Sequence, residues 1–85
     1  MEEIRDIDNH LVCYADSKRG FIERSYHKEL TSIVLPIGGE VMFTRGKCYT
    51  IIRRLDTGQL YVYSQHCSGM GFHSNIIRSR TAIIR

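Results

Sequence analysis

The strongest constraint on the fold is a series of short runs in which β-branched and aromatic residues alternate, separated by turns that contain glycine. The segment GGEVMFTRGKCYTIIRRLDTGQLYVYSQ, residues 38–65, contains three such runs. Val, Ile, Tyr and Thr favour extended backbone, and Gly46 and Gly58 supply the positive φ that tight hairpins require. The segment therefore predicts three consecutive antiparallel strands.

Runs on either side extend this pattern. HLVCYA predicts an earlier strand, and NIIRSRTAIIR predicts a closing strand, although its isoleucine pairs, seven residues apart, also fit one helix face. Residues 20–35 fit two interpretations: a helix with apolar residues four, four and three apart, or a hairpin of FIERSY and LTSIVL joined around His27–Glu29. We favour the hairpin, because Tyr26, Thr31, Ile33 and Val34 prefer extended structure.

The predicted fold is mainly β: one domain over residues 1–85, built as a small antiparallel meander of five or six strands. We expect the meander to curl into a barrel, because closure removes exposed strand edges, and a short helix remains the alternative at 20–35. A chain of 85 residues buries only about 60–65% of its unfolded surface, so a deep pocket is difficult to build. This size favours function on the exterior.

The composition is that of a soluble globular domain, with 42% hydrophobic and 25% charged residues. No apolar run approaches a membrane span, and MEEIRDIDNH is acidic where a secretory signal is basic and then apolar. We therefore expect a cytoplasmic protein with no membrane partner. Acidic residues gather at the start of the chain and none follows Asp56, which suits contact with a polyanion or an acidic protein face, or pairing of the two termini.

The segment QHCSGMGFH, residues 65–73, concentrates residues that bind metals or act as nucleophiles. A zinc site could combine it with His10 and Cys13, but adjacent His66 and Cys67 point to opposite sides of an extended chain, so no metal or cofactor is expected. Cys67 beside His66 or His73 lacks a nearby carboxylate to orient the base, so no catalytic residue is expected. Met70 and Phe72 then form either a lid on the domain or anchors for a partner.

Basic and aromatic residues on and near the central strands suggest a second kind of surface. If Tyr61 and Tyr63 face outward, they lie about 7 Å apart on one face, where bases could stack beside arginines. The alternative is that the tyrosines cover the core while the arginines point into solvent on the other face. The candidate nucleic-acid contacts are Arg45, Lys47, Arg53, Arg54, Tyr61, Tyr63, Arg78 and Arg80.

The run LPIGGEVMFTRGKCYTIIRR resembles very short β-rich proteins carried by bacterial phages and conjugative elements. In those proteins a strand ending in L-P-x-G-G leads to a two-strand unit with an F-x-R-G turn. Here the likeness covers roughly residues 10–64 and is carried by Leu35, Pro36, Gly38, Gly39, Phe43, Arg45 and Gly46. The resemblance implies stoichiometric binding to a host defence enzyme, such as inhibition of a CRISPR nuclease, without catalysis.

The resulting functional hypothesis is a non-enzymatic binding protein of a mobile genetic element that inhibits a CRISPR-Cas nuclease. The candidate partner-binding residues are Glu2, Glu3, Asp6, Met70 and Phe72. The alternative is a small β-barrel that binds nucleic acid through its arginine and tyrosine face. An exposed edge strand could also pair two copies across a two-fold axis, so a homodimer is as compatible with the sequence as a monomer.

Overall fold

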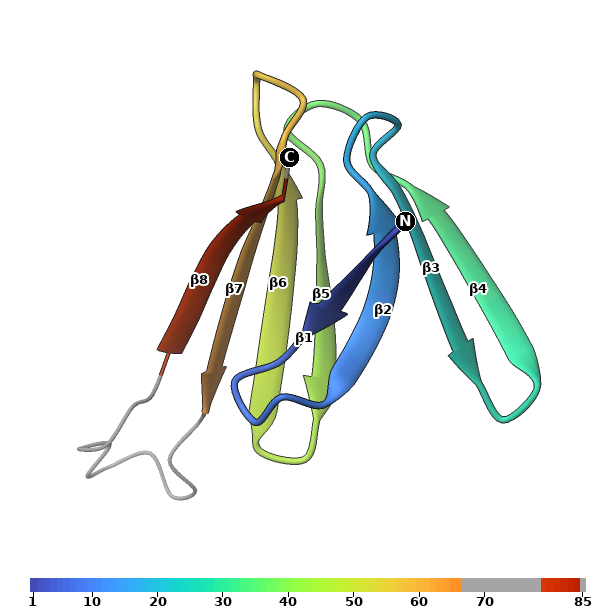
Figure 1. Ribbon diagram of the computed structural model, residues 1–85, viewed down its shortest axis with the longest axis vertical. Helices are drawn as coiled ribbons and strands as arrows, with labels where there is room; N and C mark the ends of the chain where they lie inside the picture. Colours follow the sequence, from blue (N-terminus) through green and yellow to red (C-terminus); the bar gives the residue numbers. More distant parts are fainter. Residues whose placement is uncertain (67–78, 85) are drawn as a thin grey trace.

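Eight β-strands, arranged in two antiparallel sheets, make up the described part of the chain. The computed structural model describes residues 1–66 and 79–84. The first sheet has the order β1-β2-β3-β4 and the second the order β5-β6-β7-β8, so each sheet is a meander of neighbouring strands (Figure 1). The strands are β1 Glu2–Arg5, β2 Leu11–Asp16, β3 Phe21–Tyr26, β4 Glu29–Val34, β5 Glu40–Arg45, β6 Cys48–Arg54, β7 Leu60–His66 and β8 Ser79–Ile84.

The core lies between the inner faces of the two sheets. Because side chains alternate across a strand, every second residue of the central strands points inward. Ala15 and Ile22 of the first sheet and Ile52 and Leu60 of the second are fully buried. The complete buried cluster is Ile4, Cys13, Ala15, Ile22, Leu35, Ile52, Leu60 and Val62. This shared cluster makes the two sheets one hydrophobic unit.

One arginine connects the two sheets at the end where the chain crosses between them. The Arg54 guanidinium donates hydrogen bonds to the carbonyl oxygens of Leu35 at 3.1 Å, Lys18 at 3.2 Å and Gly58 at 3.3 Å. Gly20 lies against this contact with φ +65°, and a Cβ there would lie 2.6 Å from the Leu35 carbonyl oxygen. Glycine is thus required both for the backbone angle and for the close approach.

Polar contacts connect the sheets at the opposite end. Asp6, only 1% exposed, follows β1, and one of its carboxylate oxygens accepts hydrogen bonds from the backbone N–H groups of Asp8 and His10. The next residue, Ile7, donates its backbone N–H to the Ser64 hydroxyl of β7 at 3.0 Å. The β1–β2 turn is therefore ordered internally and attached to the second sheet.

The structure confirms most of the predicted strands. The three-strand segment is β5, β6 and β7, with positive φ at Gly46 and Gly58 as expected, and the closing strand is β8. The ambiguous segment 20–35 is the hairpin β3–β4, and residues 1–66 and 79–84 contain no helix. His27 and Lys28 at its tip both have positive φ, the pattern of a type I′ turn, which matches the twist of the flanking strands.

Two features differ from the expectation. Eight strands are present among the described residues instead of five or six. One of the additional strands is β1 in the charged N-terminal segment, where three charges in four residues conceal the strand pattern. The described strands also pair as two separate sheets, and no closed barrel is found among them. The chain leaves the first sheet at Leu35 and enters the second at Glu40, so the turn at Pro36–Gly39 separates the sheets rather than continuing one.

The Arg54 contact predicts unequal effects of two neighbouring substitutions. Arg54→Ala should lower the free energy of unfolding by about 2 kcal/mol, because it removes charge-assisted hydrogen bonds to three carbonyl groups. Arg53→Ala should cost about 0.5 kcal/mol, because its partner Glu40 forms an exposed ion pair with it. Urea unfolding of both variants measures the difference, and equal losses would show that Arg54 does not connect the sheets.

Candidate functional site

The outer face of the second sheet carries a row of aromatic and apolar side chains. Thr50 and Ile52 of β6 and Leu60 and Val62 of β7 are buried, so the residues between them point away from the core. The outward set, called the tyrosine face below, consists of Met42, Tyr49, Ile51, Tyr61 and Tyr63. Met42 pairs with Ile51, and Ile51 pairs with Tyr63, so these three lie in one row across the sheet.

Hydrogen bonds and ring contacts fix part of the tyrosine face in place. The rings of Tyr49 and Tyr63 are 6.4 Å apart between centroids and are inclined by 51°. Both hydroxyl groups donate to the Oε1 atom of Gln65 on β7. Each of these two rings is fixed at Cβ and at its hydroxyl group, so this part of the tyrosine face has little conformational freedom left to lose.

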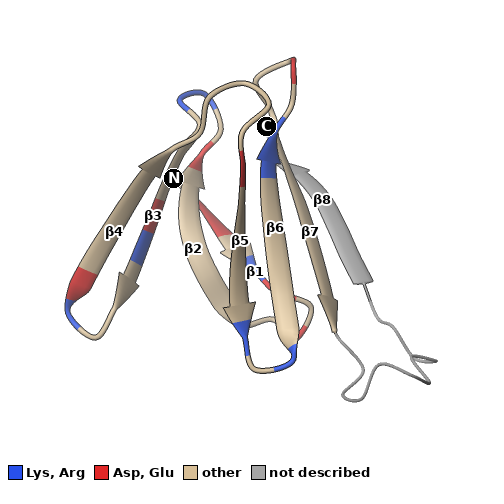
Figure 2. Ribbon diagram, turned by 180° about the vertical axis from the view of Figure 1, so that it is seen from behind, with Lys and Arg blue, Asp and Glu red and all other residues tan. Residues whose placement is uncertain are grey.

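A hollow of about 410 Å³ lies within this outer face. It is lined by Glu40, Ile51, Arg53, Leu55, Tyr61 and Tyr63. Its two charged residues neutralise each other, since Arg53 donates to a Glu40 carboxylate oxygen at 2.6 Å. Figure 2 shows that most of the length of β6 and β7 is free of Lys, Arg, Asp and Glu and that the basic residues of β5 and β6 lie near the ends of these strands. The face is thus largely apolar and electrically balanced.

The structure distributes the predicted nucleic-acid contacts over several places. Tyr61 and Tyr63 do share the outer face. Arg53 of β6 lies on the same face and forms the ion pair with Glu40 of β5. Arg45 and Lys47 are exposed at the β5–β6 turn. Arg54 is turned toward the contact between the sheets, where its guanidinium is already engaged. Arg80 belongs to β8, and Arg78 lies outside the described residues.

The predicted partner-binding residues are also dispersed. Glu2 and Glu3 are exposed on β1, at an edge of the first sheet. Asp6 is buried and organises the β1–β2 turn, so its carboxylate is directed into the protein. Met70 and Phe72, together with the question of whether their loop is a lid or an interface, lie outside the described residues.

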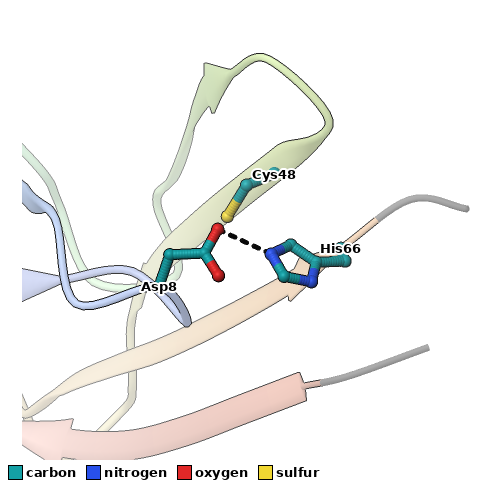
Figure 3. Close-up of side chains that lie close together, drawn as sticks. All are labelled: Asp8, Cys48 and His66. Atoms are coloured by element: carbon teal, nitrogen blue, oxygen red, sulfur yellow. Dashed lines mark hydrogen bonds and ion pairs between the residues drawn. The ribbon is translucent and has the colours of Figure 1, made fainter. Parts of the chain in front are cut away.

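A second group of side chains meets at the end of the second sheet. Cys48 begins β6 and His66 ends β7, and the two are direct cross-strand partners. Asp8 of the β1–β2 turn lies beside them, with a carboxylate oxygen 2.7 Å from Nε2 of His66 (Figure 3). The Cys48 thiol is buried and lies 3.5 Å from the Ser64 hydroxyl.

This Asp8–Cys48–His66 cluster does not have the order of a nucleophilic triad. In a triad the imidazole stands between the nucleophile and the carboxylate, with one ring nitrogen directed to each. Here the carboxylate and the sulfur lie on the same side of the His66 ring, and the other ring nitrogen points away from both (Figure 3). The three side chains point toward one place, which suits a shared ligand better than proton transfer from the thiol through the imidazole to the carboxylate.

Cys13, one of the two cysteines that could contribute to a zinc site with His10, lies away from this cluster. Cys13 faces the core and is 2% exposed. Burial raises the pKa of its thiol to about 12, while the nearby Arg24 charge lowers it in part. Because a metal ligand must be the thiolate, Cys13 is unsuited to bind metal beside the exposed His10. Cys67, the other candidate, lies outside the described residues.

Sequence reasoning missed Cys48 and Asp8 as neighbours of His66. The Cys48–His66 pairing depends on the exact register across the turn at residues 55–59, and a shift by one residue would direct them to opposite faces. Asp8 comes from a turn 40 residues before Cys48 and 58 residues before His66, and no spacing signal connects it to either strand.

Comparisons with known proteins found no match among family models, curated proteins or solved structures. The described part of the chain contains no apolar helix of membrane-spanning length.

Proposed function

We propose that this chain is a non-enzymatic binding protein that engages a host protein through the tyrosine face. The observation that carries the proposal is the difference between the two faces of the second sheet. Its inner face supplies the core, whereas its outer face presents a hollow lined by Ile51, Leu55, Tyr61 and Tyr63. Tyrosine residues in such positions contribute strongly to protein interfaces, because they bury a large area at small entropic cost.

The charges around the hollow favour a protein partner over a polyanion. Nucleic-acid affinity depends mainly on cations that are available to phosphates. On this face Arg53 is paired with Glu40. Arg54 is turned to the other side of β6, where its guanidinium is engaged with backbone carbonyls. An apolar, internally neutralised surface fits the apolar centre and polar rim of a protein interface.

The resemblance of residues 10–64 to proteins of phages and conjugative elements supports a host defence enzyme as the partner. Its most concrete form is inhibition of a CRISPR-Cas nuclease by stoichiometric binding. Such a target also supports action in the cytoplasm.

A second candidate function is binding of single-stranded nucleic acid by the same sheet. One observation favours it: Tyr61 and Tyr63 are two positions apart on one face, about 7 Å along the strand, so each ring could stack on a separate base. Arg45 and Lys47 at the β5–β6 turn would then supply the phosphate contacts. The two candidates differ in salt dependence, because phosphate contacts release counterions whereas apolar burial does not.

The tyrosine-face proposal predicts a selective loss of inhibition. The wild-type chain, titrated against purified CRISPR-Cas effector complexes, should inhibit target cleavage and saturate at a fixed stoichiometry. Tyr61→Ala/Tyr63→Ala should raise the half-inhibitory concentration at least about tenfold, because interface tyrosines commonly contribute more than 1 kcal/mol each. Tyr26→Ala is the control, since Tyr26 is an exposed tyrosine on the other sheet, away from the tyrosine face.

Equal inhibition by the double variant and the wild type would remove the tyrosine face from the interface. Binding of a labelled single-stranded oligonucleotide, measured by fluorescence anisotropy at several salt concentrations, tests the second candidate. Affinity that falls steeply with salt and is lost in the double variant would favour nucleic acid over a protein partner.

A further inference from the structure

The Asp8–Cys48–His66 cluster combines three of the side-chain types that zinc prefers. Cys48 and His66 stand directly opposite each other on the inner face of β6 and β7, which fixes their Cβ atoms within roughly 5 Å. Asp8 reaches the same place from the first sheet. Three elements thus bring a thiol, an imidazole and a carboxylate together.

The distances are close to those of a coordinated ion. One ligand atom from each residue lies within 4.8 Å of the other two. Zinc bonds of about 2.0–2.3 Å in tetrahedral geometry separate neighbouring ligand atoms by roughly 3.3–3.8 Å. Side-chain movements of about 1 Å therefore suffice to place all three atoms around one ion, and the strands need not move.

The surroundings hold the ligands in position. The Asp6 carboxylate accepts hydrogen bonds from the backbone N–H groups of Asp8 and His10. The backbone N–H of Ile7 donates to the Ser64 hydroxyl, so the turn that carries Asp8 is fixed over β7. The Cys48 side is buried, whereas His66 and Asp8 keep 25% and 37% of their side-chain surface exposed. Because these two side chains are partly exposed, water can reach this side of the cluster.

We propose that Asp8, Cys48 and His66 bind one Zn²⁺ ion. Binding converts the Cys48 thiol to a thiolate and releases its proton to solvent, so affinity should increase as the pH rises. Thiolate and imidazole select zinc over magnesium or calcium, which prefer oxygen ligands. The ion would connect the β1–β2 turn of the first sheet to the ends of β6 and β7.

Titration of the reduced full-length chain with Zn²⁺, in competition with a chromophoric chelator, tests this site. We expect one equivalent to bind, and His66→Gln and Cys48→Ser to weaken binding at least about tenfold. His27→Asn is the control, because His27 lies at the β3–β4 turn with positive φ, where asparagine is well tolerated. Co²⁺ should show a thiolate charge-transfer band that Cys48→Ser abolishes and Cys67→Ser retains.

Three results would each overturn the zinc site. The first is a wild-type chain that does not compete with the chelator. The second is metal binding that survives in His66→Gln, and the third is a charge-transfer band that depends on Cys67 instead of Cys48. Protection of the Cys48 thiol from alkylation by Zn²⁺ in the wild-type chain gives the same test without a substitution, should Cys48→Ser fail to fold.

The outer edge of the first sheet supports a second, independent inference. β4 is the terminal strand of its sheet and pairs only with β3 within the described residues (Figure 1). Leu30 and Val34 are 64% and 67% exposed. Protein edges are usually protected by lysine, proline or a bulge, as β1 is by its charges and its bulge. β4 has none of these, and its one charge, Glu29, lies beside the turn.

The hydrogen-bond pattern identifies the backbone groups of β4 that remain available. The two-residue turn makes Tyr26 and Glu29 a hydrogen-bonded pair, after which paired and unpaired positions alternate. The Leu35 N–H donates to the Gly20 carbonyl in the same register, which confirms the alternation. The N–H and C=O groups of Leu30, Ser32 and Val34 therefore point away from β3.

We infer that β4 pairs with β4 of a second copy across a two-fold axis at Ser32. The three outward residues are symmetric about this axis, so Leu30 lies opposite the partner's Val34 and Ser32 lies opposite the partner's Ser32. About six backbone hydrogen bonds form, and the exposed apolar side chains cover one another. The two Glu29 side chains stay about 20 Å apart, so no like charges meet.

Sedimentation equilibrium across a range of concentrations tests the dimer. The wild-type chain should be dimeric, and Ser32→Pro should make it monomeric, because proline removes an outward N–H without removing a bond to β3. Leu30→Lys should also give a monomer, whereas Met42→Lys, which changes a residue of similar exposure on the other sheet, should remain a dimer. A monomeric wild-type chain, or a dimer in both β4 variants, would contradict the inference.

Discussion

The arrangement of the whole molecule depends on how two meanders are held face to face. Hydrophobic burial brings the inner faces together, but it is non-directional and does not fix their relative position. Arg54 supplies direction at one end, because its planar guanidinium joins the β2–β3 turn and the segment after β4 to the β6–β7 turn through their carbonyl groups. Gly20 allows the approach, since a side chain there would collide with Leu35 and Arg54. The buried Asp6 and the Ile7–Ser64 contact hold the other end.

Because the inner faces form the core, the alternation of side chains along each strand determines which residues lie on the outer surfaces. Alternation along β6 and β7 sends Leu60 inward and Tyr61 outward, so the apolar pattern of the core creates the tyrosine face as its complement. Attachment of the β1–β2 turn carries Asp8 to the cross-strand pair of Cys48 and His66. The core and the proposed tyrosine-face interface thus lie on opposite sides of the same strands.

The sequence was informative where local preferences decide the structure. The β-branched residues of LTSIVL correctly favoured a hairpin over a helix, and Gly46 and Gly58 correctly marked turns. Arg54 shows the limit of this reasoning. It was predicted to contact phosphate beside Arg53, because nothing local distinguishes the two residues. Its partners Lys18 and Leu35 lie 36 and 19 residues away, so only the tertiary structure separates a connecting arginine from an exposed one.

The most direct test of the separation between a core-forming inner face and a binding outer face compares two adjacent residues on opposite faces of β7. Leu60→Ala and Tyr61→Ala are measured by equilibrium urea unfolding. Leu60 is fully buried, so its replacement should cost about 2–5 kcal/mol. Tyr61 lies on the outer face, so its replacement should cost about 1 kcal/mol or less, which is the range of a strand propensity. A loss for Tyr61→Ala as large as that for Leu60→Ala would mean that the tyrosine face stabilises the fold, and the assignment of this face to binding would be wrong.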